Sequence, residues 1–458
     1  MNRRKFLCHA TSLTAAATAL SQLSAFKALA AAPAGDYSAL VCLFLFGGND
    51  GNNTVVPMDA TRYAAYSSIR GAGAGGLALP LSSLVPLPIN SGGATSTPFG
   101  LHPNLSDLSG IWEAASGEGH LAIVFNVGTL VQPTTKATYA SAPLPVNLMS
   151  HSDQQLEWMD AVVTGPSRSG WGGRLGEAAG TGGELPPVIS VAGNAIYTIG
   201  DTSQPLSLPS AGGLGLNTSA SRLAALRQEL GLDLSNLIVA AASGAMTSAL
   251  HDGDIVDPIL SSTTSAVAPL FDPKVNPKLN TTIAREFSQV ARLIEARGTL
   301  GAQRQVFFVS LGGFDTHTNE IATQQTLFAQ LGPALKAFYD ATVALGLDKN
   351  VTTFTMSDFS RTLKPTSGGG SDHAWGNHHF VMGSSVKGGF YGTFPSLALG
   401  GADDFTNEGR WVPTLALDQY AATLAQWFGL PAASLAQVLP NIGAFSATSA
   451  GSNIGFMA

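Results

Sequence analysis

Aspartate and histidine side chains gather in the last third of the chain, in a pattern that suits metal binding. Four of the nine histidines lie between residues 317 and 379, and three of these fall within seven residues. The set comprises Asp315, His317, Asp358, Asp372, His373, His378 and His379. Carboxylate and imidazole groups are ligands for Zn²⁺, Mn²⁺, Fe or a harder cation. The alternative is that these are loop residues that cap helices and bond the backbone.

A glycine-rich turn follows the first apolar run of the sequence. It has the order Gly47-Gly48-Asn49-Asp50. Glycines allow the backbone to approach a ligand closely, and Asp50 would project at the edge of a sheet. The alternative is a tight turn that uses Asn and Asp for their left-handed backbone angles.

Two serines and two arginines could take part in chemistry on an anionic ester. Ser150 and Ser152 precede a helical pattern, and the N-terminus of a helix stabilises an anion or an alkoxide nucleophile. A simple N-cap is the alternative for either serine. Arg174 or Arg361 could clamp an oxyanion with two hydrogen bonds, or form an ordinary surface salt bridge. The chain has no Walker loop, no Rossmann glycine fingerprint and no Gly-x-Ser-x-Gly elbow.

Strand-like and helix-like segments alternate along the chain. Five short runs are apolar on both faces, as buried parallel strands are, at residues 39–46, 121–127, 187–191, 305–311 and 350–356. Between them, apolar residues recur at helical spacing in residues 154–163, 220–230, 281–297 and 324–344. This alternation predicts an α/β sandwich with a mostly parallel sheet. Ligands of such sheets bind beyond the carboxyl ends of the strands, which is where the aspartates and histidines stand.

The first thirty residues indicate a twin-arginine export signal. An arginine pair, Arg3-Arg4, precedes a weakly apolar run at residues 10–25 and a small-x-small site at residues 28–30. A membrane anchor is the alternative, but the run is too polar for a good span of about 20 residues. We therefore expect recognition by the twin-arginine export machinery, a periplasmic or secreted location, and no stable membrane insertion after cleavage.

The remaining chain is acidic and rich in apolar residues. Loss of residues 1–30 removes four basic side chains and no acidic one, so the net charge changes from −7 to −11. This balance argues against nucleic acid and anionic membranes as partners. Cys42 is the only cysteine beyond the signal, which excludes an internal disulfide. We expect one domain over residues 31–458, a surface loop near residues 70–100, and a cap insertion near residues 200–280.

The motifs, in their order, resemble the exported bacterial family known as domain of unknown function 1501. The resemblance rests on FGGNDGNNTVVP, SH before a helix and TG…GW.GR, GGFDTH, SDFSRT and GGGSDHAWGNHHFVMG, with RWVPTLALDQYAATLAQWFGL near the end. That family is grouped with the alkaline-phosphatase-like (sulfatase-like) superfamily. Two departures stand out. Asp358 and Ser360 occupy positions where the family usually has Glu and Gly, and Ala374 replaces a usual Gly.

The resemblance implies a three-layer α/β/α sandwich with one or two metals at the strand ends. Zinc is the first expectation, and manganese, calcium or magnesium are alternatives. The ligands implied are Asp50, Asp315, His317, Asp358, Asp372, His373 and one of His378 and His379. Ser150 or Ser152 would be the nucleophile.

Two functions follow from these patterns. The first is an exported metal-dependent hydrolase of phosphate or sulfate esters, acting on a small-molecule or polymer substrate through a metal-activated nucleophile. The second is a non-catalytic exported protein on a degenerate phosphatase-like scaffold, with a structural or ligand-binding role in the cell envelope. Convergence of the metal ligands and a nucleophile would distinguish them.

Overall fold

The computed structural model describes residues 37–458, apart from 72, 74, 92–93, 113–118, 181–182 and 233. The predicted export signal at residues 1–30 lies outside the described residues. In the described part of the chain, no helix combines the length and the apolar character needed to cross a membrane.

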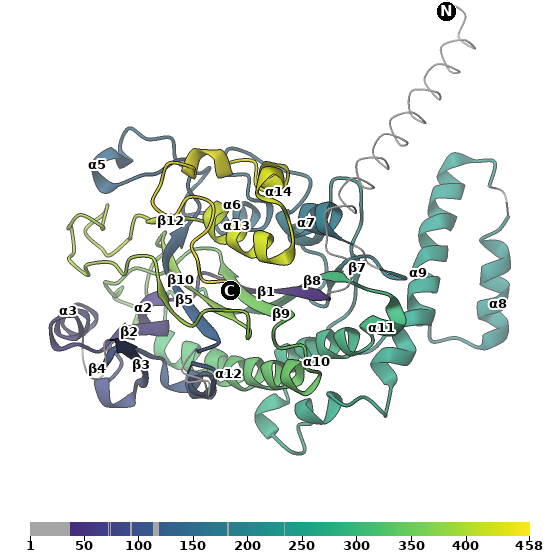
Figure 1. Cartoon of the computed structure of the whole chain (residues 1–458), viewed down its shortest axis with the longest axis horizontal. Coiled ribbons are helices and arrows are strands. Elements are labelled where there is room, and N and C mark those ends of the chain that lie inside the picture. The colour runs from purple at the N-terminus through teal and green to yellow at the C-terminus, as the bar shows by residue number, and fades with distance from the viewer. Residues whose placement is uncertain are drawn as a thin grey trace, which may run out of the picture.

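A central sheet organises the described chain (Figure 1). Its strand order is β11-β5-β10-β9-β1-β8-β6-β7, and β12 also pairs with β5. The strands are β1 (Ser38–Phe46), β5 (Leu121–Gly128), β6 (Val188–Ser190), β7 (Leu206–Ser207), β8 (Arg304–Gly312), β9 (Val351–Ser357), β10 (Asn377–Met382), β11 (Gly389–Tyr391) and β12 (Leu415–Ala416). All pairs are parallel except those of β10 with β5 and β9. The predicted, mostly parallel sheet is confirmed.

The central strand β1 is apolar on both faces because both faces are covered. Alternate residues point to opposite sides of a strand. One hydrophobic cluster therefore takes Ala39, Val41 and Leu43, and the other takes Leu40, Cys42 and Phe44. Cys42 is fully buried there.

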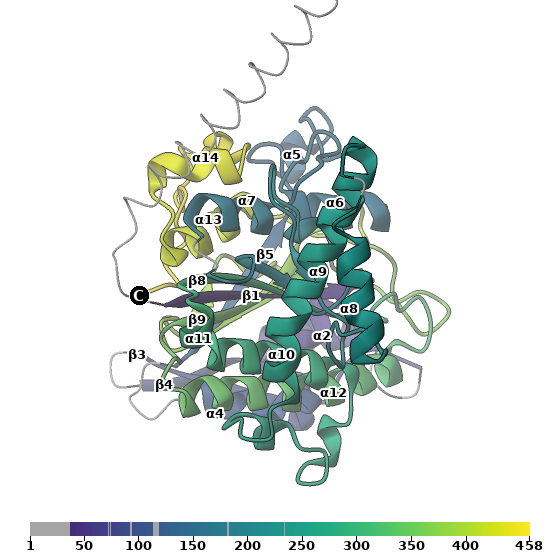
Figure 2. The same ribbon diagram turned by 90° about the vertical axis from the view of Figure 1, so that its right-hand side faces the viewer.

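Helices cover the two faces and complete three layers (Figure 2). On one face lie α4 (Ser109–Trp112), α10 (Thr282–Glu295) and α12 (Glu320–Ala344). On the other face lie α6 (His151–Asp160), α7 (Trp171–Ala179), α13 (Leu417–Phe428) and α14 (Leu435–Val438). The three-layer α/β/α sandwich is thereby confirmed.

A second sheet stands where a surface loop was expected. It has three antiparallel strands in the order β2 (Val55–Pro57), β4 (Ala94–Leu101) and β3 (Val85–Ser91). Leu87 and Phe99 face each other in this sheet and are buried, and this apolar pair explains why the segment is ordered. Nearby lie α2 (Gly51–Thr54) and α3 (Ala60–Arg70).

The segment expected to be a cap holds two long helices. They are α8 (Ala220–Glu229) and α9 (Leu237–Ser261), which stand at one side of the sandwich, and α9 packs against α10 (Figures 1 and 2). The role of this segment as a cap stays a prediction. The remaining short elements are α5 (Lys136–Tyr139), α11 (Arg297–Leu300), η1 (Leu81–Ser83), η2 (Pro103–Leu108), η3 (Ile196–Thr198), η4 (Ala268–Phe271), η5 (Pro277–Leu279), η6 (Ala432–Ser434) and η7 (Ile442–Phe445).

Candidate metal centre

The topology brings separate loops to one edge of the sheet. Strands β1, β8 and β9 are parallel, so the residues after their carboxyl ends meet there. Strand β10 runs the opposite way, so the loop before it, which carries His373, reaches the same edge. Gly47 permits the close approach of two of these loops, because a Cβ atom on it would lie 2.3 Å from the backbone nitrogen of Asp315.

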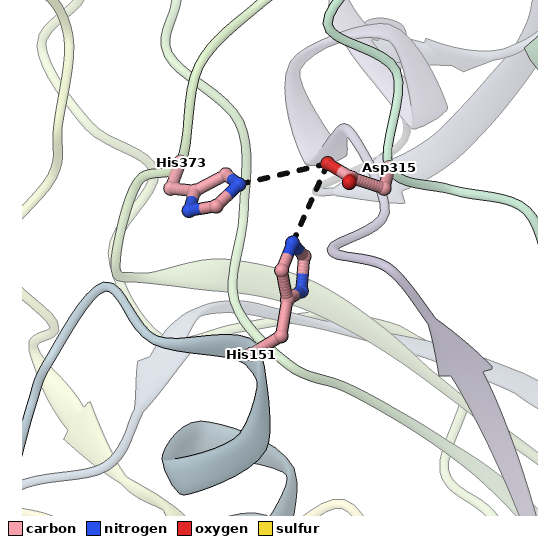
Figure 3. Close-up of side chains that lie close together, drawn as sticks. All are labelled: His151, Asp315 and His373. Carbon is pink, nitrogen blue, oxygen red and sulfur yellow. Dashed lines mark ion pairs between the residues drawn. The ribbon is translucent and has the colours of Figure 1, made fainter.

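Three side chains converge at this edge, and we call them the candidate metal triad: His151, Asp315 and His373 (Figure 3). The Oδ1 atom of Asp315 lies 3.4 Å from Nε2 of His151 and 3.5 Å from Nε2 of His373. His151 is the first residue of α6, whereas the other two side chains come from loops. Elements that are far apart in sequence thus present three potential ligand atoms to one point.

Both histidines of the triad are held in the orientation that metal binding requires. Nδ1 of His151 is 2.7 Å from Oδ2 of the buried Asp358. Nδ1 of His373 is 2.9 Å from the carbonyl oxygen of Met149. Because both partners are acceptors, each Nδ1 carries a hydrogen and each Nε2 is directed at the centre of the triad. The raised pKa of His151 favours its protonated form, so a metal at this point would have to displace the hydrogen on its Nε2. Such outer hydrogen bonds are the usual support of metal-binding histidines.

Two of the three spacings within the triad fit a tetrahedral ion, and all its ligand atoms lie within 4.8 Å of one another. Zinc bonds of about 2.0–2.1 Å to nitrogen and oxygen place neighbouring ligand atoms about 3.3–3.4 Å apart. The two distances from Asp315 to the histidines, 3.4 and 3.5 Å, match this separation. In addition, Nε2 of His151 is buried without a hydrogen-bond partner. Three protein ligands with one open position are the pattern of catalytic zinc sites.

Two further predicted ligands lie beside the triad. Nε2 of His317 is 3.1 Å from Oδ1 of Asp315 and 3.0 Å from Nε2 of His373. His317, Asp372 and His373 form a second group whose ligand atoms lie within 4.8 Å of one another. Both groups contain His373, so His317 lies close enough to the triad to serve as a fourth or an alternative ligand if a metal binds there.

Charges around the triad act in opposite directions on its members. Partial burial raises the pKa of Asp315. The hydrogen bond from Arg361 at 2.9 Å and the nearby histidines lower this pKa by more than burial raises it, so the net shift is downward. The hydrogen bond to Asp358 raises the pKa of His151 against the effect of burial. Burial lowers the pKa of His373. Asp315 is therefore kept ionised and His373 neutral, and these are the states that bind a metal.

The expected ligand Asp50 is paired with a buried arginine. Its Oδ2 atom is 2.7 Å from Nη1 of Arg70, and both side chains are buried. The same Nη1 atom lies 3.3 Å from Oε1 of Glu320. Asp50 is absent from both ligand groups found among the described residues. A cation at Asp50 would compete with the buried guanidinium of Arg70, and the role of Asp50 as a ligand stays a prediction.

The adjacent histidines His378 and His379 belong to the core. They lie on β10, 4% and 1% exposed, with the ring of His378 against Phe125 and that of His379 against Trp158. Burial lowers the pKa of each to about 3. Neither is in a ligand group, because successive residues of a buried strand point into the two hydrophobic layers.

Of the two arginines predicted to be catalytic, one lies at the triad and the other does not. Arg361 is at the site and fully buried, and it holds Asp315 while donating to the carbonyl oxygen of Ser371. Arg174 instead lies away from the triad contacts and donates to backbone carbonyls of Ser169 and Val438, so its role as an oxyanion clamp stays a prediction.

The two expected nucleophiles flank a residue of the triad. Ser150 is the N-cap of α6, but its side chain makes no capping hydrogen bond. Its Oγ atom lies 3.0 Å from Oγ of Ser152. Both hydroxyls therefore stand next to His151 in the chain, at the N-terminus of the helix.

Sequence reasoning missed two residues of the site. His151 was passed over in favour of the serines on either side of it, although a histidine at the first position of a helix was the available signal. Arg410 was also missed. It donates to Oδ2 of Asp372 at 2.6 Å and to the carbonyl oxygen of His373 at 2.7 Å, and no local pattern connects it to the site.

Two cavities bear on this assignment. One of 290 Å³ is lined by His373, Asp372 and Arg410, beside the triad. A larger one of 870 Å³ lies between α9, α10 and their loops, and none of its lining residues belongs to the triad. The triad is the candidate functional site because it forms a potential metal-ligand group, whereas no such group is found among the described residues that line the larger cavity.

Comparisons with known proteins agree with part of this picture. The family model described as "Protein of unknown function (DUF1501)" matches residues 227–416, which confirms the resemblance over that range. The range includes Asp315, Asp358 and His373 and begins after His151. No curated protein matches the chain. The predicted export stays a prediction.

Two solved structures show a remote likeness. The PsFucS1 sulfatase from Pseudoalteromonas sp. is 10% identical, with a TM-score of 0.34 over 90% of this chain and 72% of that one. The C-terminal periplasmic domain of EcEptC from Escherichia coli, in complex with Zn, is 9% identical, with a TM-score of 0.32 over 87% and 84%. The fold assignment rests on the sheet and helices described above.

Proposed function

We propose that this protein is an exported metal-dependent hydrolase of phosphate or sulfate esters. The observation that carries the proposal is the convergence of His151, Asp315 and His373, with both imidazoles fixed so that Nε2 points inward. Zinc is the metal that this combination of nitrogen and oxygen ligands favours.

A divalent cation bound by the triad would supply Lewis-acid polarisation of an ester oxygen and offset the charge of the transferring group. Of the three ligands, only the carboxylate would be charged, so a divalent ion bound by them would keep a net charge of +1. The site would then be locally positive although the chain is acidic, which suits an anionic ester.

The protein's own residues would divide the remaining work. Asp358 fixes the tautomer of His151, and the carbonyl of Met149 does the same for His373. Arg361 orients Asp315 from a buried position with its donors directed at protein oxygens, so it acts as a positioning residue. Ser150 and Ser152 supply hydroxyls at the N-terminus of α6, where helix N–H groups favour negative charge.

The test compares metal binding with turnover. Zinc-loaded protein is expected to hydrolyse 4-nitrophenyl phosphate or 4-nitrophenyl sulfate, and His373→Ala and Asp315→Asn are expected to remove both zinc and turnover. Ser150→Ala and Ser152→Ala, measured with zinc content checked, decide whether a hydroxyl is needed. His251→Ala, an exchange on the distant helix α9, is the matched control and should change neither quantity.

A non-catalytic protein on a degenerate phosphatase-like scaffold is the second candidate. It is favoured by Asp50, the first-strand carboxylate, whose charge Arg70 neutralises. Stoichiometric zinc without turnover of either ester would support this candidate over the hydrolase.

A further inference from the structure

A small cavity adjoins the triad on the side of His373. Its volume is 290 Å³, and its apolar walls are Tyr139, Leu148, Met149 and Phe405. The carbonyl of Met149 holds Nδ1 of His373, and both residues line the cavity. The cavity therefore begins at a residue that would hold the ion.

The aromatic wall is fixed in place by its surroundings. The rings of Tyr139 and Phe405 are 4.5 Å apart, and the ring of Trp375 is 5.9 Å from that of Phe405. The loop that carries Phe405 is organised by the buried Asp404, whose carboxylate accepts the backbone N–H groups of Gly400, Thr406, Gly409 and Arg410. A wall held this way needs little rearrangement to accept a ring.

The charged residues of the cavity are already paired. Arg410 donates to Oδ2 of Asp372 at 2.6 Å, while Oδ1 of Asp372 accepts the backbone N–H of His373 at 2.8 Å. Nε of Arg410 donates to the carbonyl of His373. These bonds leave few groups for the hydroxyls of a sugar, so the cavity suits an apolar group.

We propose that this cavity is the subsite for the organic part of the ester, and that the part it accepts is a single aromatic ring. The inference rests on the function proposed for the triad. The volume of 290 Å³ lies just below the range of about 300–1,000 Å³ for ligand sites, which suits one ring and not a polymer. Aromatic side chains favour rings in offset or edge-on contact. The substrates would be aryl or benzyl phosphates or sulfates.

The experiment measures binding, so it does not depend on turnover. Zinc-loaded protein is titrated calorimetrically with phenylphosphonate and with methylphosphonate, which share the anionic group and differ in the ring. We expect the phenyl compound to bind about 10- to 100-fold more tightly, from burial of one ring. Phe405→Ala should reduce this preference to within about threefold without changing zinc content.

Two further variants distinguish loss of the ring contact from a general loss of stability. Phe405→Leu preserves an apolar side chain if Phe405→Ala lowers stability, and it should weaken the preference partly. Leu156→Ala, in a separate cavity that shares no lining residue with the proposed subsite, is the control and should keep the preference. Equal binding of both phosphonates, or a preference that survives Phe405→Ala and Tyr139→Ala together, would overturn the subsite alone. Binding of neither compound would overturn the proposed function, and the subsite with it.

Discussion

The substitution Asp358→Asn tests the hydrogen bond that orients His151 while leaving all three residues of the triad in place. The buried carboxylate accepts three N–H groups. Gly47 donates to Oδ1 at 3.0 Å, while His151 and Gln155 reach Oδ2 at 2.7 and 2.8 Å. An asparagine has one acceptor oxygen and one donor group in the same space. If its oxygen keeps His151 and Gln155, its amide then faces the N–H of Gly47.

Two magnitudes follow from this geometry. The partly buried N–H of Gly47, left without a partner, lowers the free energy of unfolding by about 1 kcal/mol, at the low end of the cost for a buried group. Loss of the charge behind His151 weakens its bond to a metal, and removal of such an outer partner typically lowers metal affinity by about 10- to 100-fold. The variant should therefore fold, bind zinc more weakly, and unfold at lower urea concentration.

The assay is a zinc titration against a chelator of known affinity, combined with urea unfolding of the zinc-free protein. Asp153→Asn is the matched control, because Asp153 lies on the same helix and accepts only a long bond from Ser152. Equal zinc affinity in Asp358→Asn and wild type would refute the role assigned to His151.

Three other changes test the surroundings of the site. Arg70→Met leaves the buried carboxylates of Asp50 and Glu320 without their shared cation, and urea unfolding should show a loss of about 3–5 kcal/mol; an unchanged midpoint would contradict the pairing. His378→Ala should lower stability by about 2–4 kcal/mol while elemental analysis finds unchanged zinc, and loss of the zinc would restore this histidine as a ligand. Burial raises the pKa of Glu157 to about 8 from 4.5, so the folded state retains a proton that the unfolded state releases. Stability from this group is thus complete below pH 4.5 and is lost as the pH rises to about 8. Glu157→Gln should flatten this decline, which is on the order of 3–5 kcal/mol in the free energy of unfolding measured with urea. If the free energy of unfolding of the two proteins changes with pH in the same way, the raised pKa of Glu157 is contradicted.

The sequence predicted the fold well because the strands of the sheet are buried on both faces. Strands β1 and β8 contain continuous apolar runs, β9 is rich in β-branched residues, and the polar residues after all three mark one edge. Asp315, His317, Asp372 and His373 therefore meet as expected. The small sheet was missed because its strands lie in a stretch rich in Gly, Ser and Pro, which masks their alternation.

The remaining site residues could not be assigned from local pattern. Whether Asp50 binds a cation depends on Arg70, which lies 20 residues later on another helix. The pair His378-His379 looked like ligands, but the strand that carries them continues into the core. His151 acquires its role only because α6 packs with its first residue against the loops of β8 and β9, 164 residues or more downstream.

The most direct test of the metal centre is a crystal structure with zinc, measured at the zinc absorption edge. We expect one anomalous peak within about 2.0–2.2 Å of Nε2 of His151, Oδ1 of Asp315 and Nε2 of His373. Absence of a peak among these three atoms at saturating zinc, or a peak at Asp50 instead, would contradict the proposed centre.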